Sequence, residues 1–125
     1  MIQAIGTDLV EIDRVRKLLK RHGEKALRRL FTEEELRYAL GHQDPAPSLA
    51  ARIAAKEAFQ KCWPEGLSWK EVWVGMEGRK PVLRFAPQLQ ARLQAQGLVP
   101  HLSLSHERGY ALALVVLEAR APGAG

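Results

Sequence analysis

Residues 52–61 read RIAAKEAFQK, and this stretch says more about the fold than any other part of the 125-residue sequence. At about 100° per residue, a helix over it places small and aromatic residues on one face, which predicts packing against the protein. The opposite face carries the charged residues Arg52, Lys56, Glu57 and Lys61. Cations neutralise phosphoryl oxygens and a carboxylate can hold Mg²⁺, so this face suits a phosphate ligand with a metal. The alternative is a solvated face with i,i+4 charge pairs.

Length and composition indicate one globular domain, which we expect over residues 1–118, followed by a disordered tail over 119–125. The chain is 46% hydrophobic and 26% charged, which is enough to bury a core. The single cysteine, Cys62, cannot form an internal disulfide. The N-terminus lacks the pattern of a signal peptide and no apolar run is long enough to cross a membrane. We therefore expect a cytoplasmic protein with no membrane partner.

The net charge of +5 indicates an anionic partner. Eight basic residues lie between Arg14 and Arg29, and Glu24 is the only acidic residue among them. Nucleic acid, an acidic protein and a phosphorylated small molecule all remain open at this point. The sequence has no P-loop, no dinucleotide-binding glycine motif and no nucleophile elbow, which argues against ATPases, dinucleotide enzymes and serine hydrolases built on those motifs.

The hydrophobic periodicity predicts an α+β fold with a small mixed sheet packed against helices. Strands are expected over 4–10, 72–76, 81–85, 101–106 and 109–118. Helices are expected over 12–30, 32–40, a segment capped by Ser48 that includes 52–61, and 87–96.

Local signals refine these elements. His22-Gly23 should interrupt the first helix, and Thr32 with Glu35 forms a capping box for the second. The strand over 109–118 contains YALALVVLE, which is apolar on both faces. We therefore expect it to be central in its sheet or buried at a subunit contact.

Two residues outside the 52–61 helix are further candidates for chemistry. Asp8 lies in the apolar segment IGTDLVEI, where an unpaired carboxylate is costly to bury. It either caps the following helix or joins Glu57 as a second metal ligand. His106 ends a predicted strand, where its side chain can emerge at the sheet edge or can serve a structural purpose.

Four segments in this order resemble the holo-acyl-carrier-protein synthases, which are small 4′-phosphopantetheinyl transferases. The matching stretches are IGTDLVEIDRV at 5–15, RIAAKEAFQK at 52–61, GRKP at 78–81 and LSLSHERGYALALVVLE at 102–118. The chain departs from the usual family pattern at Gln60, where serine is common, at Glu107, where a small hydroxyl residue is common, and by one extra residue in GRKP.

The resemblance implies Mg²⁺-dependent transfer of the phosphopantetheine arm of coenzyme A to a serine of apo acyl carrier protein, in fatty acid biosynthesis. Adenosine 3′,5′-bisphosphate would be released. Asp8 and Glu57 would bind Mg²⁺. The residues that would contact coenzyme A are Arg52, Lys56, Lys61, Gly78, Pro81 and His106. Glu57 would accept the proton of the attacking hydroxyl, directly or through a metal-bound water.

The resemblance also implies a homotrimer with active sites at the subunit interfaces, so that Glu57 and Lys61 would act with His106 of a neighbouring subunit. Arg14 and Arg21 would face the acidic helix of the carrier protein. Ile53 is the only apolar side chain on the charged face of the 52–61 helix, and we expect it to join that docking surface.

Two other classes of function compete with this one. A nucleic-acid-binding module explains the basic residues between Arg14 and Arg29 but neither Asp8 nor Glu57, and the chain offers no aromatic platform for bases. A Mg²⁺-dependent phosphatase or nuclease would normally cluster more carboxylates for two metals.

Overall fold

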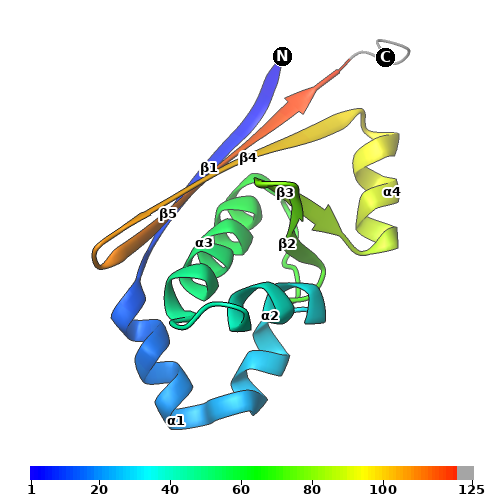
Figure 1. The fold of residues 1–125 in the computed structure, drawn as a ribbon. Coiled ribbons are helices and arrows are strands. Elements are labelled where there is room, and N and C mark those ends of the chain that lie inside the picture. Colours follow the sequence, from blue (N-terminus) through cyan, green and yellow to red (C-terminus); the bar gives the residue numbers. More distant parts are fainter. Residues whose placement is uncertain (121–125) are drawn as a thin grey trace.

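A three-stranded antiparallel sheet and the helix that lies across it form the centre of the molecule (Figure 1). The computed structural model describes residues 1–120. The sheet contains β1 (Ile2–Glu11), β4 (Leu98–Glu107) and β5 (Tyr110–Ala119), and the helix is α3 (Ala46–Cys62). The strand order is β1-β5-β4, so β5 is the central strand, as its double-sided apolar pattern predicted.

The remaining strands form a separate hairpin of β2 (Val72–Glu77) and β3 (Lys80–Phe85), followed by α4 (Pro87–Ala95). This hairpin lies on the β4 side of the main sheet (Figure 1). The α+β class is confirmed, and the strands divide between two antiparallel sheets rather than one mixed sheet.

The helices α1 (Ile12–Leu30) and α2 (Glu33–Leu40) connect β1 to α3. The α1 helix bends at Gly23, whose φ of 56° is unfavourable for other residues, so the predicted interruption is confirmed. The capping box of α2 is also present: the Glu35 N–H donates to the Thr32 hydroxyl, and the Thr32 N–H donates to the Glu35 carboxylate. None of the helices in residues 1–120 is long and apolar enough to cross a membrane.

Several predicted boundaries are wrong: β1 and β4 are longer than expected, and two other differences have a visible cause. The α3 helix begins at Ala46 rather than after Ser48, because the Asp44 carboxylate accepts the Ala46 N–H at 3.2 Å and the first turn tolerates proline. At the other end of the chain, Ala119 belongs to β5 and the Arg120 N–H donates to the Gly97 carbonyl. The expected disordered tail therefore does not include these two residues, and the rest of it, 121–125, lies outside the described residues.

The two faces of the sheet differ in exposure. The face toward α3 is buried, with Ala111, Ala113, Val115 and Leu117 on β5. The opposite face exposes large apolar side chains on neighbouring strands: Ile5 and Leu9 on β1, and Tyr110, Leu112 and Leu114 on β5. In a single copy of the chain, nothing among the described residues covers this second face.

Candidate functional site

The close approach of β1 to α3 sets the geometry of the site. A Cβ atom at Gly6 would lie 2.1 Å from the carbonyl oxygen of Ala58 and 3.0 Å from the Cys62 Sγ. Only glycine fits there, so the strand backbone rests directly on the helix. This contact brings Asp8, two residues along the strand, beside the helix turn that carries Glu57 and Lys61.

Asp8 and Glu57 form a pair of neighbouring carboxylates. The pKa of Glu57 is raised from 4.5 to about 7, first because burial disfavours its charge and then because Asp8 hydrogen-bonds to it and repels it. Lys61 and Arg14 oppose this shift with their positive charges. The Asp8 Oδ2 atom is buried and has no hydrogen-bond partner within residues 1–120. Burial and the neighbouring Asp8 carboxylate therefore outweigh the two cations in setting the pKa of Glu57, and one Asp8 oxygen is left without a protein donor.

Lys61 supplies a cation at the same place. Its Nζ donates to the Thr7 carbonyl oxygen at 2.6 Å and lies 3.4 Å from the Asp8 Oδ1. The side chain is still 57% exposed, so it can reach a ligand that approaches the two carboxylates.

The two carboxylates fit a hard divalent cation such as Mg²⁺. Mg²⁺ takes oxygen ligands, commonly one or two protein carboxylates completed by water and substrate phosphates. The unpartnered Asp8 Oδ2 and the raised pKa of Glu57 are what a pair built for an added cation would show. In the described part of the chain no group of three or more His, Cys, Asp or Glu residues could hold a metal by itself, so such an ion would need further ligands from substrate or water.

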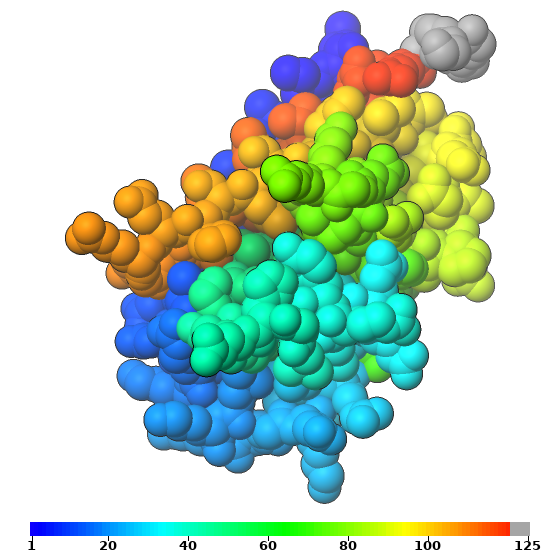
Figure 2. All heavy atoms as spheres, in the orientation of Figure 1, coloured from blue at the N-terminus to red at the C-terminus, as the bar shows by residue number. Residues whose placement is uncertain are grey.

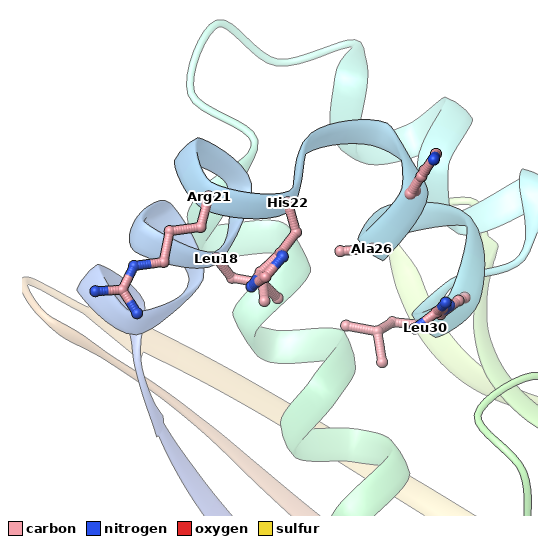
Figure 3. A pocket seen from close by; sticks show the side chains of 7 residues that line it. Leu18, Arg21, His22, Ala26 and Leu30 are labelled. Atoms are coloured by element: carbon pink, nitrogen blue, oxygen red, sulfur yellow. The ribbon is translucent and has the colours of Figure 1, made fainter.

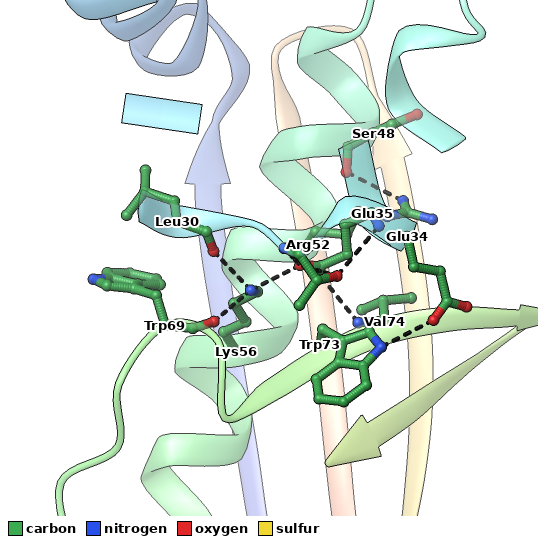
Figure 4. A network of polar contacts seen from close by, with 10 residues as sticks. Leu30, Glu34, Glu35, Ser48, Arg52, Lys56, Trp69, Trp73 and Val74 are labelled. Atoms are coloured by element: carbon green, nitrogen blue, oxygen red, sulfur yellow. Dashed lines mark hydrogen bonds and ion pairs between the residues drawn. The ribbon is translucent and has the colours of Figure 1, made fainter. Parts of the chain in front are cut away.

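Lys56 lies in a buried network rather than on an open face (Figure 4). Its Nζ pairs with the Glu35 Oε1 at 2.8 Å and donates to the carbonyl oxygens of Leu30 at 2.7 Å and Trp69 at 2.5 Å. The other Glu35 oxygen accepts the Val74 N–H at 3.0 Å. Glu35 is fully buried, and this ion pair joins α2, α3 and β2.

Arg52 is buried in the same region. Its guanidinium lies 4.2 Å from the centre of the Tyr38 ring and donates to the Ser48 carbonyl oxygen at 3.2 Å. The prediction that Arg52 and Lys56 share an open charged face with Lys61 is therefore wrong. The physical reason is that Glu35, on another helix, neutralises charge that the α3 sequence alone shows as unpaired.

The structure does not bring the GRKP turn and His106 to the carboxylate pair within one chain. Pro81 lines a hollow of about 330 Å³ with His101 and Leu102 on the β4 side of the sheet, and Gly78 lies in the turn before it. His106 is also on β4, which is two strand spacings, about 10 Å, from the strand of Asp8. It sits near the tip of the β4–β5 hairpin, which projects from the body of the molecule (Figure 2).

The basic helix α1 surrounds a hollow of about 530 Å³ at its bend (Figure 3). Four basic side chains and three apolar ones line it: Arg21, His22, Lys25, Arg29, Leu18, Ala26 and Leu30. Arg14 is exposed. It lies close enough to Glu57 for its positive charge to lower the pKa of that residue. Ile53 is half-buried and packs against the core, so it is less exposed than the sequence predicted.

Sequence reasoning missed three residues that shape the site: Gly6, Glu35 and Gln60. Glu35 was interpreted only as a helix cap, although its burial could have been suspected from the apolar residues around the 32–40 segment. Gly6 gives no local signal, and Gln60 stands out only as a departure from the family pattern, because the importance of both depends on backbone segments that only the folded chain places beside them.

The chain is similar to known proteins over almost its whole length. The family model for the 4′-phosphopantetheinyl transferase superfamily matches residues 4–115. A holo-[acyl-carrier-protein] synthase from Thermus thermophilus is 73% identical over 125 residues, which cover all of both chains.

Two crystal structures share the fold. A holo-[acyl-carrier-protein] synthase from Neisseria meningitidis matches with a TM-score of 0.85 and 37% identity, covering 94% of this chain and 99% of that one. A holo-(acyl-carrier-protein) synthase from Bacillus anthracis in complex with CoA (3′,5′-ADP) matches with a TM-score of 0.78 and 33% identity, covering 96% and 99%.

Proposed function

This chain belongs to the 4′-phosphopantetheinyl transferase superfamily, and from that membership we propose that it transfers the 4′-phosphopantetheine arm of coenzyme A to a serine of an acyl carrier protein. The observation that carries this proposal is the Asp8–Glu57 carboxylate pair with Lys61 beside it. Fatty acid biosynthesis in the cytoplasm is the setting that the sequence predicted, and it stays a prediction.

The chemistry follows from the charges at the site. The serine oxygen attacks the β-phosphorus, the bond from that phosphorus to the bridging oxygen breaks, and adenosine 3′,5′-bisphosphate leaves. Glu57 accepts the serine proton, directly or through a water molecule beside it. Lys61 stabilises negative charge on the phosphoryl oxygens. Mg²⁺ held by Asp8 and Glu57 would neutralise the diphosphate and assist departure of the leaving phosphate.

The coenzyme contacts divide between residues that are accessible and residues that are buried. We assign phosphate contact to the half-exposed Lys61. Lys56 already holds three protein oxygens, so its contribution is to fix α3 in place. Arg52 keeps its Nε and Nη2 without partners within residues 1–120 but lies buried beneath Tyr38. The adenosine end would lie at the turn that contains Gly78 and at Pro81, which follows it in β3.

The assembly we propose is a homotrimer. Support comes from the exposed apolar face of the sheet, where Leu9 lies opposite Leu112 and Ile5 opposite Val116. Apolar surface of this kind usually marks a protein contact. A neighbouring copy would also supply His106, which its own chain keeps away from the carboxylate pair.

The carrier-protein surface we propose is the basic helix α1 with Arg14, Arg21 and the half-buried Ile53. The hollow at the α1 bend combines cations with apolar walls, which suits an acidic helix that presents an apolar side chain. Binding of nucleic acid would explain the basic residues of α1 but would leave the Asp8–Glu57 pair without a role.

A direct experiment tests the reaction. The protein is incubated with coenzyme A, Mg²⁺ and apo acyl carrier protein, and the carrier is weighed by mass spectrometry. A gain of about 340 Da, the mass of one phosphopantetheine arm, is expected from the metal-assisted transfer. An unchanged carrier mass, with the protein folded, would contradict the proposal.

A further inference from the structure

Gln60 binds the loop that follows α3 with its whole amide group. Its Nε2 donates to the carbonyl oxygen of Glu65 at 2.7 Å and contacts that of Trp63 at 3.5 Å. Its Oε1 accepts the N–H of Leu67 at 2.8 Å. One side chain therefore satisfies a donor and an acceptor on two different parts of the same loop.

Lys56 holds the next part of that loop. Its Nζ donates to the Trp69 carbonyl oxygen at 2.5 Å. Lys56 and Gln60 are four residues apart, which places them on the same side of α3. Glu57 lies between them in the sequence. The loop over 63–69 is thus tied to the helix on both sides of the Glu57 position.

A cavity of about 160 Å³ lies between the helix and the loop. Its helix wall contains Lys56, Glu57 and Gln60, and its other wall contains Leu67, Ser68, Trp69 and Val72. The loop side offers apolar side chains with one hydroxyl, and the helix side includes the carboxylate to which we assign the proton transfer. The position of the loop therefore determines the shape of the space beside Glu57.

We infer that Gln60 is a positioning residue, which fixes the 63–69 loop as the wall against which the apolar part of the phosphopantetheine arm lies. This inference rests on the proposed function, because it takes coenzyme A as the ligand. Gln60 acts through the loop: all three of its hydrogen-bond contacts are to loop backbone atoms. A wall that is ordered in advance costs less entropy when the arm binds, so it lowers the KM for coenzyme A.

The test compares Gln60→Met with Gln88→Met. Methionine has a similar length but makes none of these hydrogen bonds, and Gln88 is an exposed residue of α4 that serves as the matched control. In Gln60→Met, the KM for coenzyme A should rise about tenfold, as expected from the loss of the two short hydrogen bonds to Glu65 and Leu67. The kcat and the KM for the carrier should change little, and Gln88→Met should behave as wild type. A residue with a merely structural role would lower the melting temperature and leave this KM unchanged.

Hydrogen exchange at the Leu67 amide provides a second measurement that does not depend on transfer. Exchange should be faster in Gln60→Met than in wild type, and coenzyme A should slow it in wild type but much less in the variant. Gln60→Glu retains an acceptor for the Leu67 N–H, so its exchange rate should lie between those of wild type and Gln60→Met. This variant separates the loss of the hydrogen bonds to the loop from a loss of the whole fold.

Two results would overturn the inference. One is a Leu67 amide that exchanges equally fast in wild type and Gln60→Met. The other is a released loop with an unchanged KM for coenzyme A and unchanged protection by it. Failure of the proposed function looks different: wild type would add no mass to the carrier, whereas the exchange measurement would still report whether coenzyme A contacts the loop.

Discussion

Glu57 is the residue on which the proposed chemistry depends, because it combines burial, a neighbouring carboxylate and a place beside Lys61. A carboxylate with a pKa of about 7 is present in both protonation states near neutral pH. Asp8 causes part of that shift and leaves one buried oxygen without a partner. Together, the two residues fit the proposed site for a proton and a cation.

The first prediction concerns this pair. Glu57→Gln and Asp8→Asn should each slow arm transfer by about 10²- to 10⁴-fold, the usual effect of removing a general base or its charge partner. The rate is measured by the mass gain of the carrier. Glu33→Gln, at an exposed residue of α2, is the control and should remain active. Near-normal turnover in either variant with Mg²⁺ present would contradict the shared site.

The pH dependence of stability gives a second prediction. The pKa of Glu57 rises from 4.5 in the unfolded chain to about 7 in the fold, so between these values the folded protein keeps a proton that the unfolded chain has lost. In metal-free protein the free energy of unfolding should therefore fall as pH rises from about 4.5 through about 7. Thermal unfolding with a chelator measures this. The fall should be smaller in Glu57→Gln and smaller in wild type with Mg²⁺; an equal fall in Glu57→Gln would contradict the prediction.

The carboxylate pair could be anticipated from the sequence, but the exposure of the cations could not. Asp8 is conspicuous as a charge in an apolar segment, and Glu57 as the only carboxylate among the cations of the 52–61 helix. Lys56 and Arg52 have the same helical phase whether they face water or Glu35, and only the folded chain shows which. Lys56 can be buried because Glu35 neutralises its charge and three oxygen atoms accept its N–H groups.

At the scale of elements, the β1–α3 contact decides whether the site exists. The third prediction is that Gly6→Ala lowers the free energy of unfolding by about 1–3 kcal/mol, because the new methyl group meets a helix carbonyl and forces strand and helix apart. Activity should fall as well, since Asp8 moves with the strand. Chemical denaturation measures the loss. Gly66→Ala is the control, because a Cβ there meets nothing within 4 Å. Equal stability of the two variants would refute the argument.

The α1 helix carries the fourth prediction. Charge reversal in an Arg14→Glu, Arg21→Glu double variant should raise the KM for the carrier by at least about tenfold at low salt. The KM for coenzyme A should stay nearly unchanged, because neither side chain is assigned to the coenzyme. The effect should shrink as salt rises. Steady-state kinetics at two salt concentrations measure both constants, and an unaltered carrier KM at low salt would exclude the docking role.

Elements with local signals were predicted well. The bend at Gly23 and the capping box at Thr32 depend on residues a few positions apart, and both are present. The start of α3 was placed too late because Asp44, in the preceding loop, accepts the Ala46 N–H. Boundaries that depend on a neighbouring segment are the ones that local patterns do not fix.

At the scale of the whole molecule, a single chain holds the parts of the proposed active site on opposite edges of one sheet. The Asp8 carboxylate belongs to β1 and His106 belongs to β4, with β5 between them. The double-sided apolar pattern of β5 predicted a central strand or a subunit contact. The structure confirms the central position and leaves one apolar face exposed, with Leu9, Leu112 and Tyr110 more than two-fifths accessible.

The fifth prediction tests whether this face joins copies into a homotrimer. Wild type should sediment at three times the 14.0 kDa of one chain. Leu112→Glu should sediment as one chain and lose activity, because a charge on the apolar face opposes association. Its control, Gln94→Glu, adds a charge at an exposed residue of α4, outside this face of the sheet, and should remain trimeric. A monomeric wild type at micromolar concentration would rule out the assembly.

Complementation then shows whether His106 acts across the interface. Asp8→Asn and His106→Ala should each be inactive alone. When the two variants are unfolded together and refolded as mixed assemblies, some sites combine the intact Asp8 of one chain with the intact His106 of another. Activity should therefore return to a substantial fraction of wild type. If both residues acted within one chain, no mixed assembly could contain an intact site, and the mixture would stay inactive.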